Sequence, residues 1–159
     1  MTHKPGNPIT ILMADDDKED CMLVEKAFNE SRLANDLRFV EDGEELMDYL
    51  HCRGRYKEPE SCPRPGVILL DLNMPKKSGQ EALKEIKEDD GLKCIPIVVL
   101  TTSQNEADVL KSYNLGASSY VTKPVTFQGL VEVVKSLGKY WFDIVELPCP
   151  PDCGKAEGK

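Results

Sequence analysis

Three consecutive aspartates, Asp15 to Asp17, directly follow an apolar run in the stretch ILMADDD. A second apolar run, VILLD, also ends at an acid, Asp71, and two later apolar runs lead into Thr101 and Lys123. Carboxylate oxygens are the ligands that a hard cation such as Mg²⁺ prefers, and a hydroxyl and an ammonium can contact an anionic group. A carboxylate in such company is equipped to accept a phosphoryl group, because that transfer needs mainly positioning and charge neutralisation.

Alternating apolar and amphipathic segments are expected to position these residues. The apolar segments predict five strands, within 9–14, 36–42, 66–72, 94–102 and 118–124. The segments between and after them have helical spacing and predict helices that start near 18, 43, 79, 105 and 126. The second of these helices is expected to run to Gly54 and the fourth to end at Gly116.

Strands that alternate with helices indicate an α/β fold with a parallel sheet that is doubly wound, with helices on both faces. Ligands of such sheets bind outside the carboxyl ends of the strands, where the strand order reverses. The acids, Thr101 and Lys123 all follow strands, so they are expected to meet at this edge.

Composition excludes several classes of function. The net charge is −8 and the sequence pI is about 4.8, which argues against a nucleic-acid partner and against adhesion to an anionic membrane. No apolar run approaches the ~20 residues that span a bilayer. The first residues, MTHKPGNP, are not typical of a signal peptide, so we expect a cytoplasmic protein.

The cysteines and the longest connection complete the expectations drawn from the residues. Without an export signal, the scattered Cys21, Cys52, Cys62 and Cys94 are predicted to be free thiols. Cys149 and Cys153 form a close pair to which no role is assigned. The segment RYKEPESCPRP, residues 55–65, is rich in proline and without periodicity, and it is predicted to be an exposed loop.

Four segments, ILMADDD, VILLDLNMPKKSG, PIVVLTTS and SSYVTKP, resemble in order the active-site segments of two-component response regulator receiver domains. The resemblance covers roughly residues 8 to 138 and implies the flavodoxin-like fold of that family. It implies that Asp71 is the phosphoacceptor and that Asp16 and Asp71 are Mg²⁺ ligands. Asn73 would ligate the metal through its backbone carbonyl, and Asp15 would bind it through water.

The same resemblance implies further roles at the ends of the last strands. Thr101 matches the switch hydroxyl, Lys123 matches the family's lysine, and the peptide bond before Pro124 would be cis. Tyr120 stands where the family places a switch aromatic, although a packed core aromatic would fit the position equally well. Asp17 has no role in the pattern, and we expect it to cap the first helix.

Three longer stretches, CRGRYKEPESCPRPG, LTTSQNEADVLKSYNLGASSYVTKPV and LGKYWFDIVELP, resemble the single-domain response regulators that pair with cyanobacterial and bacterial phytochromes. The implied phosphoryl donor is the phosphohistidine of a light-regulated histidine kinase. Onward transfer to a histidine phosphotransfer protein is left open.

The expected domain organisation is a disordered N-terminus (1–7), a receiver domain with an extended last helix (8–143) and a C-terminal tail (144–159). Tyr140, Trp141, Ile144 and Val145 continue the apolar stripe of the last helix. They either pack back onto the core or form a contact surface. We expect a homodimer through the fourth helix, fifth strand and last helix, with this extension.

Two other functions compete with a phosphoacceptor. A small metal-dependent phosphatase with an aspartate nucleophile usually carries a second aspartate two residues later, where this chain has Asn73. A receiver-like interaction module that never takes phosphate would not need Asp16, Asp71, Thr101 and Lys123 together. Asp15 to Asp17 alone would also fit a solvated helix cap.

Overall fold

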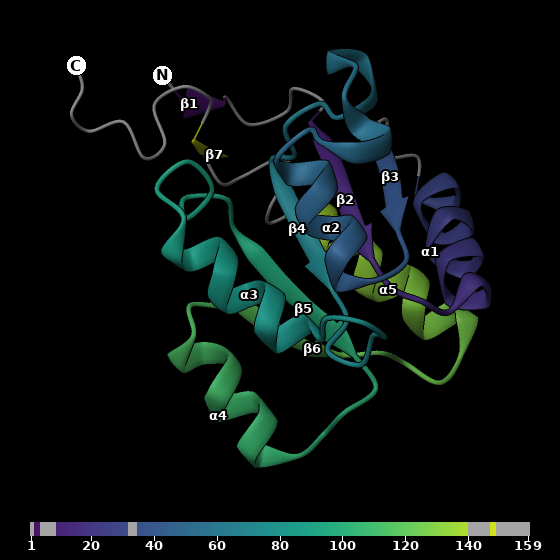
Figure 1. Ribbon diagram of the computed structural model, residues 1–159. Coiled ribbons are helices and arrows are strands. Elements are labelled where there is room, and N and C mark those ends of the chain that lie inside the picture. Colours follow the sequence, from purple (N-terminus) through teal and green to yellow (C-terminus); the bar gives the residue numbers. More distant parts are fainter. Residues whose placement is uncertain (1, 4–8, 32–34, 140–146, 149–159) are drawn as a thin grey trace.

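A parallel sheet of five strands forms the centre of the computed structural model, which describes residues 2–3, 9–31, 35–139 and 147–148 (Figure 1). Its strands are Thr10–Ala14 (β2), Asp36–Val40 (β3), Val67–Leu70 (β4), Ile97–Thr101 (β5) and Ser119–Thr122 (β6). The order across the sheet is β3-β2-β4-β5-β6, and all four pairings are parallel. The strand order reverses between β2 and β4, so a ligand site is expected beyond the carboxyl ends of these two strands.

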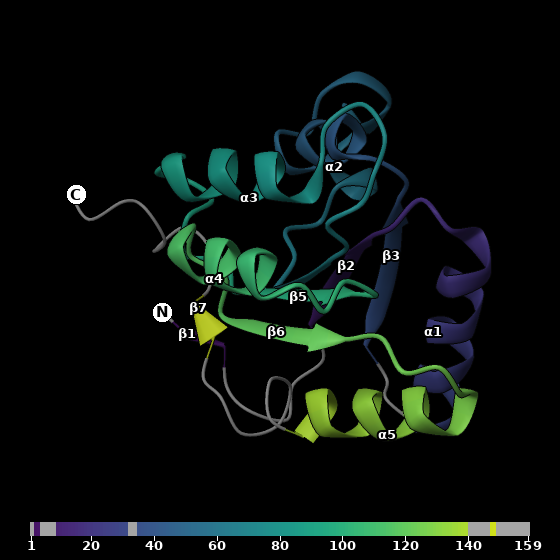
Figure 2. The ribbon, with the colours of Figure 1, turned by 90° about the horizontal axis from the view of Figure 1, so that it is seen from below.

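Helices cover both faces of this sheet, as the alternation of segments predicted (Figure 2). They are Lys18–Glu30 (α1), Gly43–Leu50 (α2), Gly79–Glu88 (α3), Glu106–Asn114 (α4) and Phe127–Leu137 (α5). Helices α2, α3 and α4 lie on one face, whereas α1 and α5 lie together on the other. The doubly wound α/β fold is therefore confirmed.

The core consists of two layers, one on each side of the sheet. Along β2, Leu12 and Ala14 join the layer under α2 and α3, whereas Ile11 and Met13 join the layer under α1 and α5. Every residue of β4 and β5 is buried, because both strands are covered on both faces. Asp71 directly follows β4 and Thr101 is the last residue of β5, so two of the site residues are held by these buried strands.

Short polar side chains begin the helices next to the site. Asp17 is the N-cap of α1 and accepts hydrogen bonds from the backbone N–H groups of Glu19 and Asp20, which confirms the predicted cap. Ser78 and Glu81 form a capping box at the start of α3. Gly116 follows the C-cap of α4, Leu115, and has a φ of +108°. This conformation favours glycine, as expected for a glycine at the end of a helix.

The connection between α2 and β4 corrects two predictions. Helix α2 ends at Leu50, before Gly54, and the chain then forms the short 3₁₀ turns Gly54–Tyr56 and Pro59–Ser61. Cys52 and Cys62 are joined by a disulfide, so they are not free thiols, whereas Cys21 is free as predicted.

The same connection is not simply exposed either. Tyr56 is buried, packs edge-on against Tyr49 with ring centroids 5.1 Å apart, and donates a hydrogen bond to Glu45. The hydroxyl of Tyr49 donates to the carbonyl of Pro63 at 2.8 Å. These aromatic contacts fold the segment back onto α2, which brings the two sulphur atoms together.

A small second sheet joins parts of the two chain ends. Thr2–His3 (β1) pairs antiparallel with Leu147–Pro148 (β7), so two residues of the N-terminus that was expected to be disordered form a ladder with two residues of the predicted C-terminal tail. The predicted contact residues Tyr140, Trp141, Ile144 and Val145, and the pair Cys149 and Cys153, lie outside the described residues. Among the helices that are described, none is both long and apolar enough to cross a bilayer.

Candidate functional site

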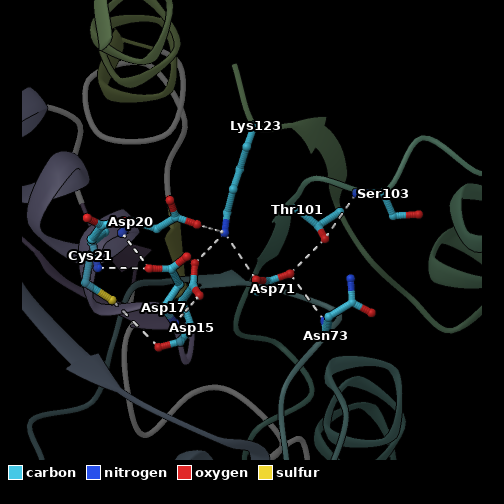
Figure 3. A network of polar contacts seen from close by, with 10 residues as sticks. Asp15, Asp17, Asp20, Cys21, Asp71, Asn73, Thr101, Ser103 and Lys123 are labelled. Atoms are coloured by element: carbon cyan, nitrogen blue, oxygen red, sulfur yellow. Dashed lines mark hydrogen bonds and ion pairs between the residues drawn. The ribbon is translucent and has the colours of Figure 1, made fainter. Parts of the chain in front are cut away.

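The predicted site residues meet at the carboxyl edge of the sheet, at the reversal of strand order (Figure 3). The backbone N–H of Asp15 donates to Val40 at 3.0 Å, that of Asp71 donates to Ala14 at 3.0 Å, and that of Lys123 donates to Thr101 at 2.7 Å. Each of these three residues is therefore fixed by a hydrogen bond to the last residue of a neighbouring strand. The strands, rather than flexible loops, set the geometry of the site.

Asp15, Asp16 and Asp71 form a compact group of carboxylates. One oxygen from each lies within 4.8 Å of the others. Asp15 and Asp71 are buried, with 1% and 7% of their surface exposed, whereas Asp16 is open to solvent. Three convergent carboxylate oxygens with one open side fit a hard divalent cation that keeps some of its waters. The backbone carbonyl of Asn73 as a fourth ligand stays a prediction.

Lys123 supplies the positive charge in the middle of this group. Its Nζ lies 2.5 Å from Asp15 Oδ2, 2.7 Å from Asp20 Oδ2 and 3.1 Å from Asp71 Oδ2. Only 9% of the Lys123 side chain is exposed, so its ammonium is largely removed from water. The ammonium thus neutralises part of the carboxylate charge (Figure 3).

The pKa values of Asp15 and Lys123 are both raised, which disfavours the charged form of the aspartate and favours the charged form of the lysine. Burial raises the pKa of Asp15 from 3.8 to about 6, and the hydrogen bonds from Lys123 and from the Asp17 backbone only partly offset that rise. Burial also acts against the charge of Lys123, but the hydrogen bonds to Asp15 and Asp20 outweigh it and raise the lysine pKa. Lys123 is therefore protonated at neutral pH. The ionised form of Asp15 is disfavoured by burial, and a bound cation would stabilise it.

The two oxygens of Asp71 have different surroundings. Oδ1 accepts a hydrogen bond from the Thr101 hydroxyl at 2.7 Å and another from the Asn73 backbone N–H at 3.3 Å. Oδ2 faces Lys123. Thr101 is fully buried, so its hydroxyl has a fixed direction. Asp71 is consequently the carboxylate at which the other two carboxylates, the Lys123 ammonium and the Thr101 hydroxyl converge.

Gly79 allows the loop after Asp71 to fold tightly against the start of α3. A Cβ atom at this position would lie 2.2 Å from the Asp71 carbonyl oxygen and 2.7 Å from Leu72 Cα. The Gly79 N–H donates to the Leu72 carbonyl at 3.0 Å. Only glycine permits this approach of two backbone segments.

Tyr120 connects the site to the surface of α4. Its ring is half-buried and packs against the core layer under α2 and α3. Its hydroxyl donates to the carbonyl of Ser103 at 2.9 Å, and the Ser103 N–H lies 3.5 Å from the Thr101 hydroxyl. Tyr120 is thus both a packed aromatic and a neighbour of the loop that follows Thr101.

Sequence reasoning missed Asp20 and Ser103. Asp20 lies in the first turn of α1, where acidic residues are common because they favour a helix N-terminus, so nothing singled it out. Ser103 follows β5 by two residues, between the predicted strand and the predicted helix, and nothing in the sequence singled it out. Its hydroxyl donates to Asp108 of α4 at 2.6 Å. The isomer of the peptide bond before Pro124 stays a prediction.

The fold and this site define a class of protein. Residues 11–135 match the response regulator receiver domain, which is most of the chain, and the chain belongs to this family. It is therefore a phosphoacceptor signalling protein rather than an enzyme that turns over a substrate, and the phosphatase alternative is not supported.

Particular relatives narrow the comparison to response regulators of phytochromes. The chain is 42% identical over 148 residues to response regulator Rcp1 of Synechocystis sp., covering 93% of this chain and 99% of Rcp1. The crystal structure of the phosphorylated cyanobacterial phytochrome response regulator RcpA has a TM-score of 0.83 at 40% identity, covering 90% of this chain and 100% of RcpA. The Mn²⁺-bound form of Rcp1 has a TM-score of 0.81 at 43% identity, covering 89% and 100%.

Proposed function

We propose that Asp71 accepts a phosphoryl group from the phosphohistidine of a sensor histidine kinase, and that this kinase is a phytochrome. The observation that carries the proposal is the convergence of Thr101, Lys123 and the other carboxylates on Asp71. The phytochrome is inferred from the similarity to Rcp1 and RcpA. The exchange would take place in the cytoplasm, on the intracellular side of such a signalling system.

The chemistry follows from the charges around Asp71. An Asp71 oxygen forms a bond to phosphorus, the bond from phosphorus to the donor's imidazole nitrogen breaks, and the imidazole leaves with its electron pair. Lys123 lies 3.1 Å from Asp71 and can follow the phosphoryl oxygens as negative charge develops there. Mg²⁺ bound by Asp16 and Asp71, by the Asn73 carbonyl and by Asp15 through water would neutralise the same oxygens. The Mn²⁺-bound form of Rcp1 supports a divalent cation in this pocket.

Thr101 and Tyr120 would couple phosphorylation of Asp71 to a structural change at the start of α4. We propose that the acyl phosphate competes with Asp71 for the Thr101 hydroxyl and so shifts the loop that carries Ser103. Tyr120 holds the Ser103 carbonyl and Asp108 holds the Ser103 hydroxyl, so a shift of this loop would move the start of α4.

A groove beside Lys123 offers a docking place for the kinase domain that bears the phosphohistidine. It lies between α1 and the start of α5, and Leu23, Val125 and Phe127 line it together with Asp20 and Lys123. Val125 is fully exposed and Leu23 and Phe127 are partly so, which makes an apolar rim next to the reacting carboxylate. A donor seated there would deliver its phosphohistidine along the open side of the site.

A second apolar surface supports the proposed homodimer. Leu110 and Tyr113 of α4 are 64% and 47% exposed. Ser112 is the one residue of α4 that is buried, so this helix presents most of its side chains outward. We propose that α4, β6 and α5 form the dimer face. Onward transfer to a histidine phosphotransfer protein would use the same acyl phosphate.

Intact-mass measurement tests the phosphoacceptor. The protein and its Asp71→Asn variant are incubated with Mg²⁺ and acetyl phosphate, and then with a phosphorylated phytochrome kinase. One added phosphoryl group on the wild type alone supports the proposal, and Asp89→Asn, outside the site, is expected to behave as the wild type. If neither donor modifies the wild type, the chain is instead an interaction module that does not take phosphate.

A further inference from the structure

Asp20 holds the ammonium of Lys123 from outside the group of three carboxylates. Its Oδ2 lies 2.7 Å from Lys123 Nζ, and its side chain is 30% exposed. It follows the N-cap Asp17 by three residues, so its backbone is fixed by the hydrogen bond from its N–H to that cap. Asp20 does not belong to the group of acids that could hold a cation.

The other two carboxylates that contact Lys123, those of Asp15 and Asp71, could also bind a metal ion. Asp15 and Asp71 belong to the candidate metal site. A bound divalent cation would draw on their oxygens, and a phosphoryl group on Asp71 would occupy another. Of the three carboxylates that contact Lys123, only Asp20 would then remain uncommitted. Lysine has a flexible four-carbon stem, so its position depends on the groups that bind its ammonium.

We propose that Asp20 is a positioning residue that retains the Lys123 ammonium beside Asp71 while the cation and the phosphoryl group are bound. This inference rests on the proposed phosphotransfer at Asp71. Asp20 touches neither the candidate cation site nor Asp71, and it acts through Lys123 alone. Its fixed place in the first turn of α1 makes it a rigid anchor, which a surface side chain on a loop would not be.

The decisive variants are Asp20→Asn, Asp20→Glu and Glu19→Gln. Asp20→Asn keeps the size of the side chain and removes its charge, and Asp20→Glu keeps the charge. Glu19 is the exposed neighbour in the same helical turn, with no contact to Lys123. Glu19→Gln therefore removes one negative charge near the site without touching the anchor, and it controls for the change in net charge.

The first measurement is the rate of phosphorylation by phosphoramidate at saturating Mg²⁺. Loss of the anchor is expected to slow Asp20→Asn about tenfold, as a misplaced catalytic group does. Glu19→Gln is expected to match the wild type, and Asp20→Glu is expected to recover part of the rate. Thermal unfolding of each variant verifies that it folds.

The second measurement observes the ammonium itself. In ¹⁵N-labelled protein with Mg²⁺ and no phosphoryl donor, the Lys123 ammonium is expected to give a slowly exchanging NMR signal in the wild type and in Glu19→Gln. Asp20→Asn is expected to lose that signal. This readout does not require phosphorylation, so it tests the anchor even if the wild type takes no phosphate and the proposed function fails.

Three results would overturn the inference. An Asp20→Asn rate equal to that of the wild type, with the NMR signal intact, would make Asp20 an ordinary exposed acid. A faster Asp20→Asn rate would mean that Asp20 competes with the phosphoryl group for Lys123. A lower unfolding temperature with an unchanged rate would assign Asp20 to stability alone.

Discussion

Asp15 is a buried acid whose surroundings oppose its charge. Burial raises its pKa from 3.8 to about 6 in the metal-free protein, despite the contact with Lys123. A raised pKa in the folded state means that the stabilising contribution is fully present below pH 3.8 and is lost as the pH rises through about 6. At neutral pH, the ionised Asp15 therefore destabilises the fold unless a cation is bound.

Asp15→Asn should stabilise the metal-free protein at pH 7, by at most about 3 kcal/mol, because it removes a charge that burial disfavours. The difference from the wild type should shrink as the pH falls toward 4, where Asp15 is protonated. Thermal unfolding in chelator across this range measures both effects. Added Mg²⁺ should stabilise the wild type more than the variant. A difference that does not change with pH would contradict the assignment of the pKa to Asp15.

The sequence placed most of the site because its residues share one position in the pattern. Asp15, Asp71 and Thr101 each end or follow a buried strand, and parallel strands bring such residues to one edge. Asp20 could not be found in this way, because it sits inside a helix and contacts Lys123 across 103 residues of sequence. The direction of a helical side chain toward a distant strand is a tertiary property.

At the scale of elements, the loop between β4 and α3 depends on Gly79. Gly79→Ala would place a Cβ atom 2.2 Å from a backbone oxygen, so the backbone must shift. We expect a loss of about 1–3 kcal/mol of unfolding free energy and weaker Mg²⁺ binding, because the shifted segment carries Asp71. Gly91→Ala is the control, since its nearest contact is the Asp89 side chain at 3.3 Å. Equal stability of the two variants in denaturant titrations would refute the expectation.

The disulfide closes the segment that precedes β4. Its two cysteines are separated by 10 residues, so replacing both by serine should reduce stability by up to about 3 kcal/mol. A reducing agent should lower the unfolding temperature of the wild type toward that of the double variant. Cys21→Ser, which removes a thiol outside this disulfide, should respond to reduction as the wild type does. Wild-type unfolding that ignores the reducing agent would mean that the bond is not formed in the isolated protein.

Elements were predictable where a periodic pattern meets a clear cap, and unpredictable where neither exists. The start of α3 at Gly79 and the cap at Asp17 follow from local hydrogen bonding. The segment after Leu50 has no period, and its shape comes from the burial of Tyr56 and the pairing of Cys52 with Cys62. The scattered spacing of the cysteines gave no indication of that pairing.

At the scale of the whole molecule, the groove beside Lys123 should be needed for binding the kinase and not for the chemistry at Asp71. Val125→Lys places a charge on its apolar rim, and Val125 is fully exposed, so folding should be unaffected. Phosphotransfer from the phytochrome kinase should slow at least tenfold, whereas phosphorylation by acetyl phosphate should stay unchanged, because that donor needs no docking surface. An equal loss with both donors would show that Val125 acts on the chemistry and not on docking.

The exposed face of α4 should be needed for dimer formation and not for phosphotransfer from the kinase. Leu110→Lys introduces a charge at a side chain that is 64% exposed. Sedimentation of the phosphorylated protein should change from dimer to monomer, because a charge in an apolar contact is costly. Transfer from the kinase should be preserved in this variant. A dimer that withstands Leu110→Lys would place the contact elsewhere.

The division of the helices between the two faces of the sheet determines which complexes are compatible. Helix α4 lies on the face of the sheet opposite α1 and α5 (Figure 2). The groove beside Lys123 is lined by residues of α1 and by residues at and before the start of α5. A kinase domain in the groove therefore leaves the α4 side chains uncovered. A kinase that is itself a dimer could bind two copies of this chain at once. Phosphotransfer and formation of the proposed homodimer could then take place in a single complex.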